Sequence, residues 1–459
     1  MLLAFALPAL MQGFMYTPAW VALQGVYASE FGLPLAGLGT AILLARVFDA
    51  VTDPAIGLAS DAWQRRYGTR KPFLWAGAPL TMLALVCLFN PPAGVDLRWF
   101  GGWFMATFLG WTLIEIPYRA WSLELSSDHG QRARIAAWLA ASGFGGAALF
   151  YALPLAGQVL GLDTNAAISA QTLRVASVVA LVGVPIGILL ASGLVPDGPR
   201  LPERTTDSPH TLLRALFGNG PFVYVLGVYL AFGIALGMQA SVLFFYVGHY
   251  LRLPDRLALV LLLSLPLSIV SAPLWGWLAG RMESHRAWAL SLVVIAAGIG
   301  LIGLIPPGPD AFGWYLAGAG VVMFCATAGY VALPAMIGDI NDYGIWKFGH
   351  DRAGTYFSVY TLLVKTVAGV GAAAGLALLD WFGFDATRTD LNGGAIVGLK
   401  LTYVWIPAAI ILGVAPLIWR FPLTRARHAQ IMRALRRRAA AADIPATGHG
   451  PPDSRAVRA

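Results

Sequence analysis

The chain has 459 residues, of which 58% are hydrophobic and 12% are charged, and it carries a formal net charge of +8. Ordinary soluble domains are about 25% charged, so this composition excludes a soluble globular protein and predicts an all-α membrane protein. The positive charge implies no nucleic-acid partner, because most of the basic residues fall in predicted inner loops and in a basic tail.

Apolar runs of about 20 to 28 residues alternate with polar stretches, and an α-helix needs this length to cross a bilayer. We therefore predict twelve transmembrane helices. Their expected ranges are 3–27, 34–60, 73–91, 99–123, 137–161, 172–195, 220–248, 257–279, 287–305, 313–337, 354–381 and 399–420. The inner loops would carry about 13 Lys and Arg and the outer loops about 6, which predicts a multi-pass protein of the cell (inner) membrane with both termini in the cytoplasm.

The polar stretch 196–219 predicts a cytoplasmic linker between two six-helix bundles, 1–195 and 220–421, and a basic cytoplasmic tail follows at 422–459. Two short internal matches support a duplication of the six-helix unit. The motif at 57–61 matches that at 276–280, and Ile116-Pro117 matches Leu333-Pro334, at near-equal offsets. Two pseudo-symmetric halves with a site between them are typical of the major facilitator fold.

The predicted helix 34–60 carries an unusual set of ionisable residues. Arg46, Asp49 and Asp53 are spaced i, i+3 and i+7 and share one helix face. Two carboxylates with the hydroxyl of Thr52, or one from a neighbouring helix, supply oxygen ligands for Na⁺, and the same pair can hold a proton. We predict a cation site at Asp49 and Asp53; the alternative is that Arg46 and Asp49 pair only to hold helices together.

Two more predicted helices contain charges that need partners. In 99–123, Glu115 lies four residues before Arg119 and one turn after Trp111, so these side chains either contact substrate, with Trp111 as a stacking surface, or form an internal ion pair. Lys365 stands alone in 354–381, and an unpaired ammonium in the bilayer is costly. We expect it to reach the aspartates of 34–60, either as part of the site or as a structural ion pair.

Charges also gather at the predicted cytoplasmic ends of the helices. Asp61 and Arg70 flank one inner loop, and Asp339, Asp342 and Arg352 flank another. We predict that these residues, together with Arg46, gate the inner face through salt bridges that break on switching. The alternative is a set of solvated loops.

The stretch RVFDAVTDPAIGLASDAWQRRYGTRKP resembles the signature of the glycoside-pentoside-hexuronide:cation symporters, the major facilitator branch that contains melibiose permease. The similarity continues through Glu115-Ile-Pro117 and GDINDYGIWKFGHDRAGTYFSVYTLLVK. The resemblance implies that Asp49 and Asp53 bind the cation, as Na⁺ ligands if the coupling ion is sodium. It implies that Thr112 completes that site, and that Glu115 and Lys365 match residues of the substrate region.

The sequence departs from this family at two positions. Gly13 stands where sugar carriers of the family have a sugar-binding aspartate, with only Gln12 nearby, and Arg119 stands where melibiose permease has a stacking aromatic. An arginine offers a planar fork of donors, which suits an anionic substrate such as a hexuronate or a phosphate-bearing lipid.

We therefore predict a cation-coupled (Na⁺ or H⁺) symporter of a glycoside, uronide or related small solute, including anionic ones, that works by alternating access. A lysophospholipid or amphiphile carrier of the same fold is the alternative, and a non-transporting membrane sensor is the alternative of another class. No enzyme motif is found, so we expect no enzyme and no cofactor beyond the coupling ion. The expected partners are a small-molecule substrate and membrane lipid, and the expected state is a monomer.

Overall fold

The computed structural model describes residues 1–126, 128–161, 165–198, 214–350 and 352–442, and these residues form helices and no β-strand. Eleven of the described helices are long and apolar enough to cross a membrane. Helices satisfy their own backbone hydrogen bonds, which is what the water-free bilayer core requires. The prediction of an all-α membrane protein is confirmed.

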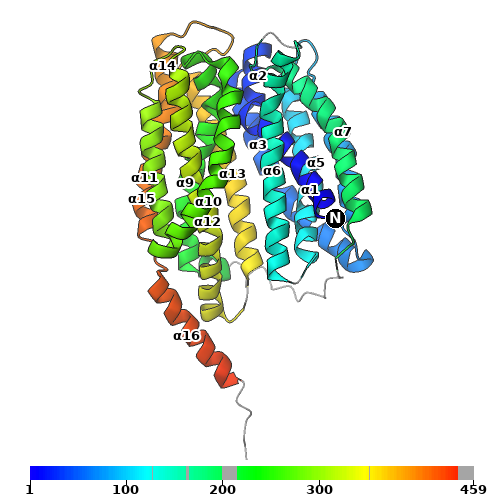
Figure 1. Cartoon of the computed structure of the whole chain (residues 1–459), viewed down its shortest axis with the longest axis vertical. Helices are drawn as coiled ribbons and strands as arrows, with labels where there is room; N and C mark the ends of the chain where they lie inside the picture. The colour runs from blue at the N-terminus through cyan, green and yellow to red at the C-terminus, as the bar shows by residue number, and fades with distance from the viewer. Residues whose placement is uncertain (127, 162–164, 199–213, 351, 443–459) are drawn as a thin grey trace, which may run out of the picture.

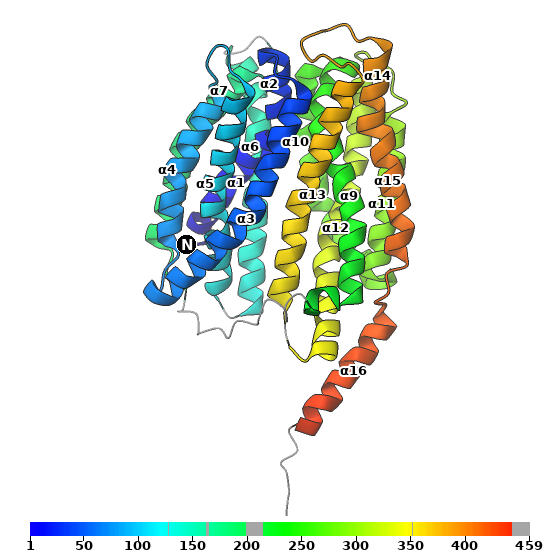
Figure 2. The same ribbon diagram turned by 180° about the vertical axis from the view of Figure 1, so that it is seen from behind.

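The helices lie side by side in two groups, one formed by the first half of the chain and the other by the second (Figure 1, Figure 2). The first group contains α1 (Leu2–Val21), α2 (Leu23–Phe31), α3 (Leu35–Tyr67), α4 (Lys71–Phe89), α5 (Leu97–Glu124), α6 (His129–Val159) and α7 (Ala170–Leu194). The second contains α9 (Gly220–Phe245), α10 (Leu257–Met282), α11 (Ser284–Ile302), α12 (Ala311–Phe348), α13 (Ala353–Trp381), α14 (Gly393–Lys400) and α15 (Ile406–Trp419). A further helix, α16 (Arg425–Ala442), follows at one end of the bundle.

The predicted fourth span, α5, is not among the eleven apolar helices. It is nevertheless 28 residues long and packs against α3 and α4. Its apolar character is lowered by Glu115 and Arg119, and also by Arg98 and by the tryptophan, glycine and threonine residues along the helix. Some of the residues that lower its hydropathy, Glu115 and Arg119 among them, are ones that the sequence predicts for the site.

Several helices extend beyond their predicted spans. α3 continues to Tyr67 and α12 to Phe348, whereas the apolar runs end near 60 and 337, and α6 begins at His129 rather than near 137. Hydropathy marks the part of a helix that suits lipid, but helical hydrogen bonding continues into the charged residues that follow. α3 and α12 end instead at Gly68 and Gly349, which take positive φ of 77° and 79°.

Close helix contacts depend on glycines. A Cβ on Gly13 or Gly146 would lie 2.0 Å from a carbonyl oxygen across the α1–α6 contact. A Cβ on Gly237 would lie 1.9 Å from a carbonyl oxygen of α13, and one on Gly371 would lie 2.2 Å from one of α9. Small residues let membrane helices approach closely. The two groups therefore use the same kind of contact within equivalent helix pairs.

The two groups meet mainly along α3 and α13. Gly39 of α3 packs on Ala373 of α13, and Gly25 of α2 packs on Phe244 of α9, toward the end of the bundle opposite α16. The predicted linker 196–219 lies largely outside the described residues, so the domain boundaries stay predictions. The predicted tail includes α16, a helix that sequence reasoning did not anticipate.

Candidate functional site

Charged side chains from α3, α5 and α13 converge where the two groups of helices meet. The Lys365 ammonium donates to Asp53 Oδ2 at 3.0 Å and lies 3.4 Å from Glu115 Oε2. These contacts join α13 of the second group to α3 and α5 of the first. The lysine therefore reaches an aspartate of α3, and it also reaches the glutamate of α5.

The second oxygen of Asp53 is held by α5. Thr112, with 1% of its surface exposed, donates its hydroxyl to Asp53 Oδ1 at 2.9 Å. Pro54 follows directly in α3 and has no N–H, so the carbonyl of Ala50 loses its helical partner beside the carboxylate. Asp53 thus accepts from one neutral and one charged donor, both on other helices.

Asp49 lies one turn before Asp53 and has a different partner. Its Oδ2 accepts from Arg46 Nη1 at 2.8 Å, and both residues are 3% exposed. The guanidinium also lies 3.8 Å from the centroid of the Phe108 ring. Asp49 Oδ1 is buried and accepts no hydrogen bond from the described residues.

The oxygen atoms around Asp49 and Asp53 suit a small hard cation. Asp49 Oδ1 has no hydrogen-bond partner among the described residues, and Thr112 adds a hydroxyl oxygen beside Asp53. The Thr52 hydroxyl donates to the carbonyl of Phe48 at 3.1 Å, which leaves its lone pairs available. These residues fit Na⁺ or a proton, and their role as ligands stays a prediction.

Glu115 is the centre of a second cluster on α5. Trp111 Nε1 donates to Oε2 at 2.7 Å, and Arg119 Nε donates to Oε1 at 2.8 Å. The Arg119 side chain is 71% exposed although its partner Glu115 is buried. The guanidinium of Arg119 is therefore accessible, although the carboxylate that it binds is enclosed.

Two exposed aromatic side chains, Tyr16 and Tyr330, were not singled out by sequence reasoning. Tyr16 of α1 packs on Trp111, with ring centroids 5.4 Å apart. Tyr16 is 38% exposed and Trp111 is buried, so the accessible ring of this pair is that of the tyrosine. Tyr330 of α12 is 79% exposed although it lies near the middle of its helix. The spacing of Tyr16 from Gln12, four residues on one face of α1, is the signal that could have identified it.

Gln12, predicted to contact substrate, is 8% exposed, and its Nε2 has no partner among the described residues. A buried amide donor without an acceptor costs free energy unless a ligand or water satisfies it. Its assignment to the substrate site stays a prediction.

Arg46 is packed against α13 at a glycine. A Cβ on Gly369 would lie 2.1 Å from Arg46 Cγ and 3.1 Å from its Cβ and Cδ. Only a residue without a side chain fits there, so the geometry of the Arg46–Asp49 pair depends on this position of α13. Arg46, predicted as a gating residue, thus lies inside the bundle at the contact between the two groups.

The predicted gating residues Asp61 and Arg70 meet at the α16 end of the bundle. Arg70 Nη2 lies 2.6 Å from Asp61 Oδ1 and 2.8 Å from Glu124 Oε1. Its Nη1 donates to Ser60 Oγ at 2.7 Å. Glu124, the last residue of α5, was missed because it lies at the end of a predicted span among polar residues. All four residues belong to the first group of helices.

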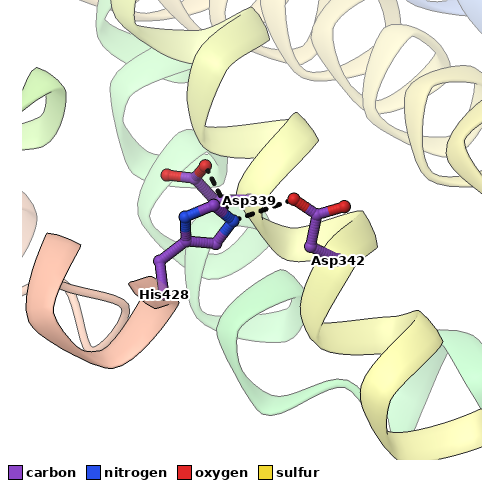
Figure 3. A group of neighbouring side chains, drawn as sticks. All are labelled: Asp339, Asp342 and His428. Atoms are coloured by element: carbon purple, nitrogen blue, oxygen red, sulfur yellow. Dashed lines mark hydrogen bonds and ion pairs between the residues drawn. The ribbon is translucent and has the colours of Figure 1, made fainter. Parts of the chain in front are cut away.

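The other gating aspartates face α16. His428 Nε2 lies 2.8 Å from Asp342 Oδ2 and 3.6 Å from Asp339 Oδ1 (Figure 3). Arg352 is 7% exposed, and its backbone N–H donates to Asn341 Oδ1 at 3.1 Å. His428 was not anticipated, because the sequence predicts only a basic segment for the tail.

Comparisons with known proteins agree with this fold. The family model described as MFS/sugar transport protein matches residues 4–425. The isoprimeverose transporter of Lactiplantibacillus pentosus is 22% identical, over 83% of this chain and 80% of its own length. The glucuronide carrier protein homolog of Escherichia coli K12 is 23% identical, over 94% of both chains.

Solved structures show the same fold at low sequence identity. The nucleoside transporter NupG has a TM-score of 0.66 at 12% identity and covers 92% of this chain and 98% of its own. The inward-open structure of the xylose transporter XylE from E. coli has a TM-score of 0.64 at 15% identity, covering 95% and 98%. The major facilitator fold is thereby confirmed.

Proposed function

The chain belongs to the MFS/sugar transport protein family, and from this premise we propose that it is a cation-coupled symporter of a glycoside or uronide. Its relatives are membrane transporters, several of them named as symporters or as carriers of sugars and glucuronides, and it is no enzyme. The coupling ion, the substrate and the role of each residue are parts of this proposal.

The contact between Lys365 and Asp53 carries the proposal. The ammonium lies 3.0 Å from the carboxylate that would bind the coupling ion, so the lysine and a cation would compete for the same charge. A cation held by Asp53, Asp49 and Thr112 would release Lys365 toward Glu115 and the substrate. Because Lys365 belongs to the other group of helices, loading the cation site would alter the contact between the two groups.

The charges of the site favour an anionic substrate. Three carboxylates and three cationic side chains meet there, and their formal charges sum to zero. They are Asp49, Asp53, Glu115, Arg46, Arg119 and Lys365. Adding Na⁺ or H⁺ gives the site one positive charge, and a monovalent anion such as a uronide restores neutrality. Net charge is costly in the bilayer interior, so cation and anion would favour each other's binding.

The positions of the contacts support alternating access. Close packing between the groups, such as Gly25 on Phe244 and Gly39 on Ala373, lies toward the end opposite α16. At the α16 end, Arg70 binds partners within the first group and Asp342 binds His428 of α16, so these ion pairs do not connect the two groups there. We assign the structure to the state that opens on the α16 face, which we take as cytoplasmic from the distribution of basic residues.

Uptake into proteoliposomes tests this function. A methyl glucuronide and the matched methyl glucoside differ in their carboxylate, and each is offered with an imposed Na⁺ gradient, an H⁺ gradient or none. We expect gradient-driven accumulation of the glucuronide above that of the glucoside, and no response to a membrane potential if one cation moves with one monoanion. Accumulation of a lysophospholipid instead would favour the amphiphile carrier, and no gradient dependence for any solute would refute symport.

A further inference from the structure

We propose that Asp339, Asp342 and His428 form a binding site for a divalent transition-metal ion that fastens α16 to α12. The three side chains come from two helices that are far apart in the sequence and are directed toward one another (Figure 3). The site is separate from the proposed cation site of α3. Metal binding itself does not depend on the proposed function, whereas its effect on the transport cycle rests on that function.

The positions of the donor atoms fit a small metal ion. One ligand atom from each residue lies within 4.8 Å of the others. His428 Nε2 is 2.8 Å from Asp342 Oδ2 and 3.6 Å from Asp339 Oδ1. In a tetrahedral zinc site with bonds of about 2.0 to 2.2 Å, neighbouring donor atoms are roughly 3.3 Å apart. The two observed separations lie on either side of this value, so small movements of the side chains would complete the site.

The chemistry of the donors selects the class of metal. An imidazole nitrogen is a ligand for Zn²⁺ and its first-row neighbours, whereas Mg²⁺ and Ca²⁺ prefer oxygen ligands alone. Two carboxylates and a neutral imidazole would leave one position of a tetrahedral site for water. The side chains of Asp339, Asp342 and His428 are 41%, 31% and 26% exposed, which admits both an ion and this water.

The arrangement of the ligands means that a bound metal would cross-link α12 and α16. Asp339 and Asp342 lie at i and i+3 on α12, and His428 lies in the first turn of α16, so an ion would cross-link two separate segments. α16 is otherwise attached by the apolar side chain of Ile431, which is 5% exposed, and by a few hydrogen bonds: Arg425 donates to Glu283 and to the carbonyl of Ala279, and Arg438 donates to the carbonyl of Trp346. The sequence of α16 includes six arginines and no acidic residue. A metal would therefore add a cross-link at the start of a basic helix that has few hydrogen bonds to the bundle.

The position of the metal site on α12 links it to the helices that carry the proposed transport site. Asp342 lies shortly before the turn into α13, the helix that carries Lys365. While the two aspartates are bound to α16, they cannot form salt bridges with the first group of helices. Metal binding would thus favour the state that opens on the α16 face.

The first test is direct metal binding to the purified full-length protein. Zn²⁺ alone is titrated by calorimetry, and Co²⁺ alone is used to detect visible absorption of a tetrahedral site. We expect one equivalent to bind, and His428→Ala and Asp342→Asn to weaken it by at least about 10- to 100-fold, since losing even an outer-shell partner costs that much. The matched control is His350→Ala, which removes an exposed histidine just beyond α12.

The second test measures α16 itself by hydrogen exchange of its backbone amides. Zn²⁺ is expected to slow exchange in α16 by about tenfold or more in the wild type and in His350→Ala, but not in His428→Ala. No saturable binding by the wild type, or binding that survives His428→Ala, would overturn the proposal and leave the cluster as an ordinary ion pair. The same conclusion would follow if Zn²⁺ bound without protecting α16.

Discussion

Replacing Gly369 with alanine is expected to disrupt the site through Arg46. The added Cβ would lie 2.1 Å from Arg46 Cγ, whereas ordinary van der Waals contact begins at 3.4 Å. The arginine stem, or α13 itself, must therefore move by about 1.3 Å, the difference between 3.4 and 2.1 Å. The stem cannot swing away freely, because its guanidinium is held 2.8 Å from Asp49 and 3.8 Å from the Phe108 ring centroid.

Overpacking of this kind costs about 1 to 3 kcal/mol. We expect part of this strain to distort the Arg46–Asp49 pair in the folded transporter, and because about 1.4 kcal/mol corresponds to a tenfold change, gradient-driven uptake should fall on the order of tenfold. The assay is the initial uptake rate in proteoliposomes, normalised to the amount of folded transporter. Thermal unfolding in detergent measures the loss of stability in parallel.

Two controls separate a clash from a general effect of the substitution. Gly354→Ala lies in the same helix, where an added Cβ meets no atom within 4 Å, so it should leave uptake unchanged. Combining Gly369→Ala with Arg46→Ala removes Cγ and Cδ and leaves only the Arg46 Cβ at 3.1 Å, so the stability cost of Gly369→Ala should shrink by about 1 kcal/mol or more in that background. Wild-type uptake in Gly369→Ala, or full additivity of the two substitutions, would refute the packing argument.

Two further substitutions test the charges of the site. Lys365→Ala removes the ammonium that competes for Asp53, so the protein should bind the coupling cation more tightly and lose uptake. The tighter binding is measured as a lower Na⁺ or H⁺ concentration for half-maximal thermal protection. Unchanged cation affinity would contradict the competition. Arg119→Ala should reduce uptake of the glucuronide about tenfold more than uptake of the glucoside, and equal losses would remove the argument for an anionic substrate.

Much of this fold could be predicted because lipid imposes strong rules on sequence. Runs of apolar residues located the helices, and the cost of charge in the bilayer identified Asp49, Asp53, Glu115 and Lys365 as residues in need of partners. The distances between these charged side chains could not be predicted, because they depend on the register in which α13 packs along α3. Gly369 sets this register by admitting the stem of Arg46, and no hydropathy pattern reports it.

The missed residues lacked a sequence signal of the same strength. Tyr16 and Tyr330 are aromatic residues in apolar helices, where most aromatic residues only fill space. Glu124 and His428 lie at helix ends that are rich in polar residues, so their partners become visible only when Arg70 and Asp342 are placed in space. Charge inside the membrane is informative from sequence alone, whereas charge at its surface is not.

Asp53→Asn tests the central claim most directly, because it keeps the shape of the side chain and an acceptor for Thr112 but removes the charge that Lys365 and the cation would share. We predict that accumulation driven by a Na⁺ or H⁺ gradient is abolished while substrate binding and exchange without a gradient persist in part. The control is Asp380→Asn, an exposed carboxylate near the end of α13, which should transport as the wild type does. Full gradient-driven accumulation by Asp53→Asn would contradict the account.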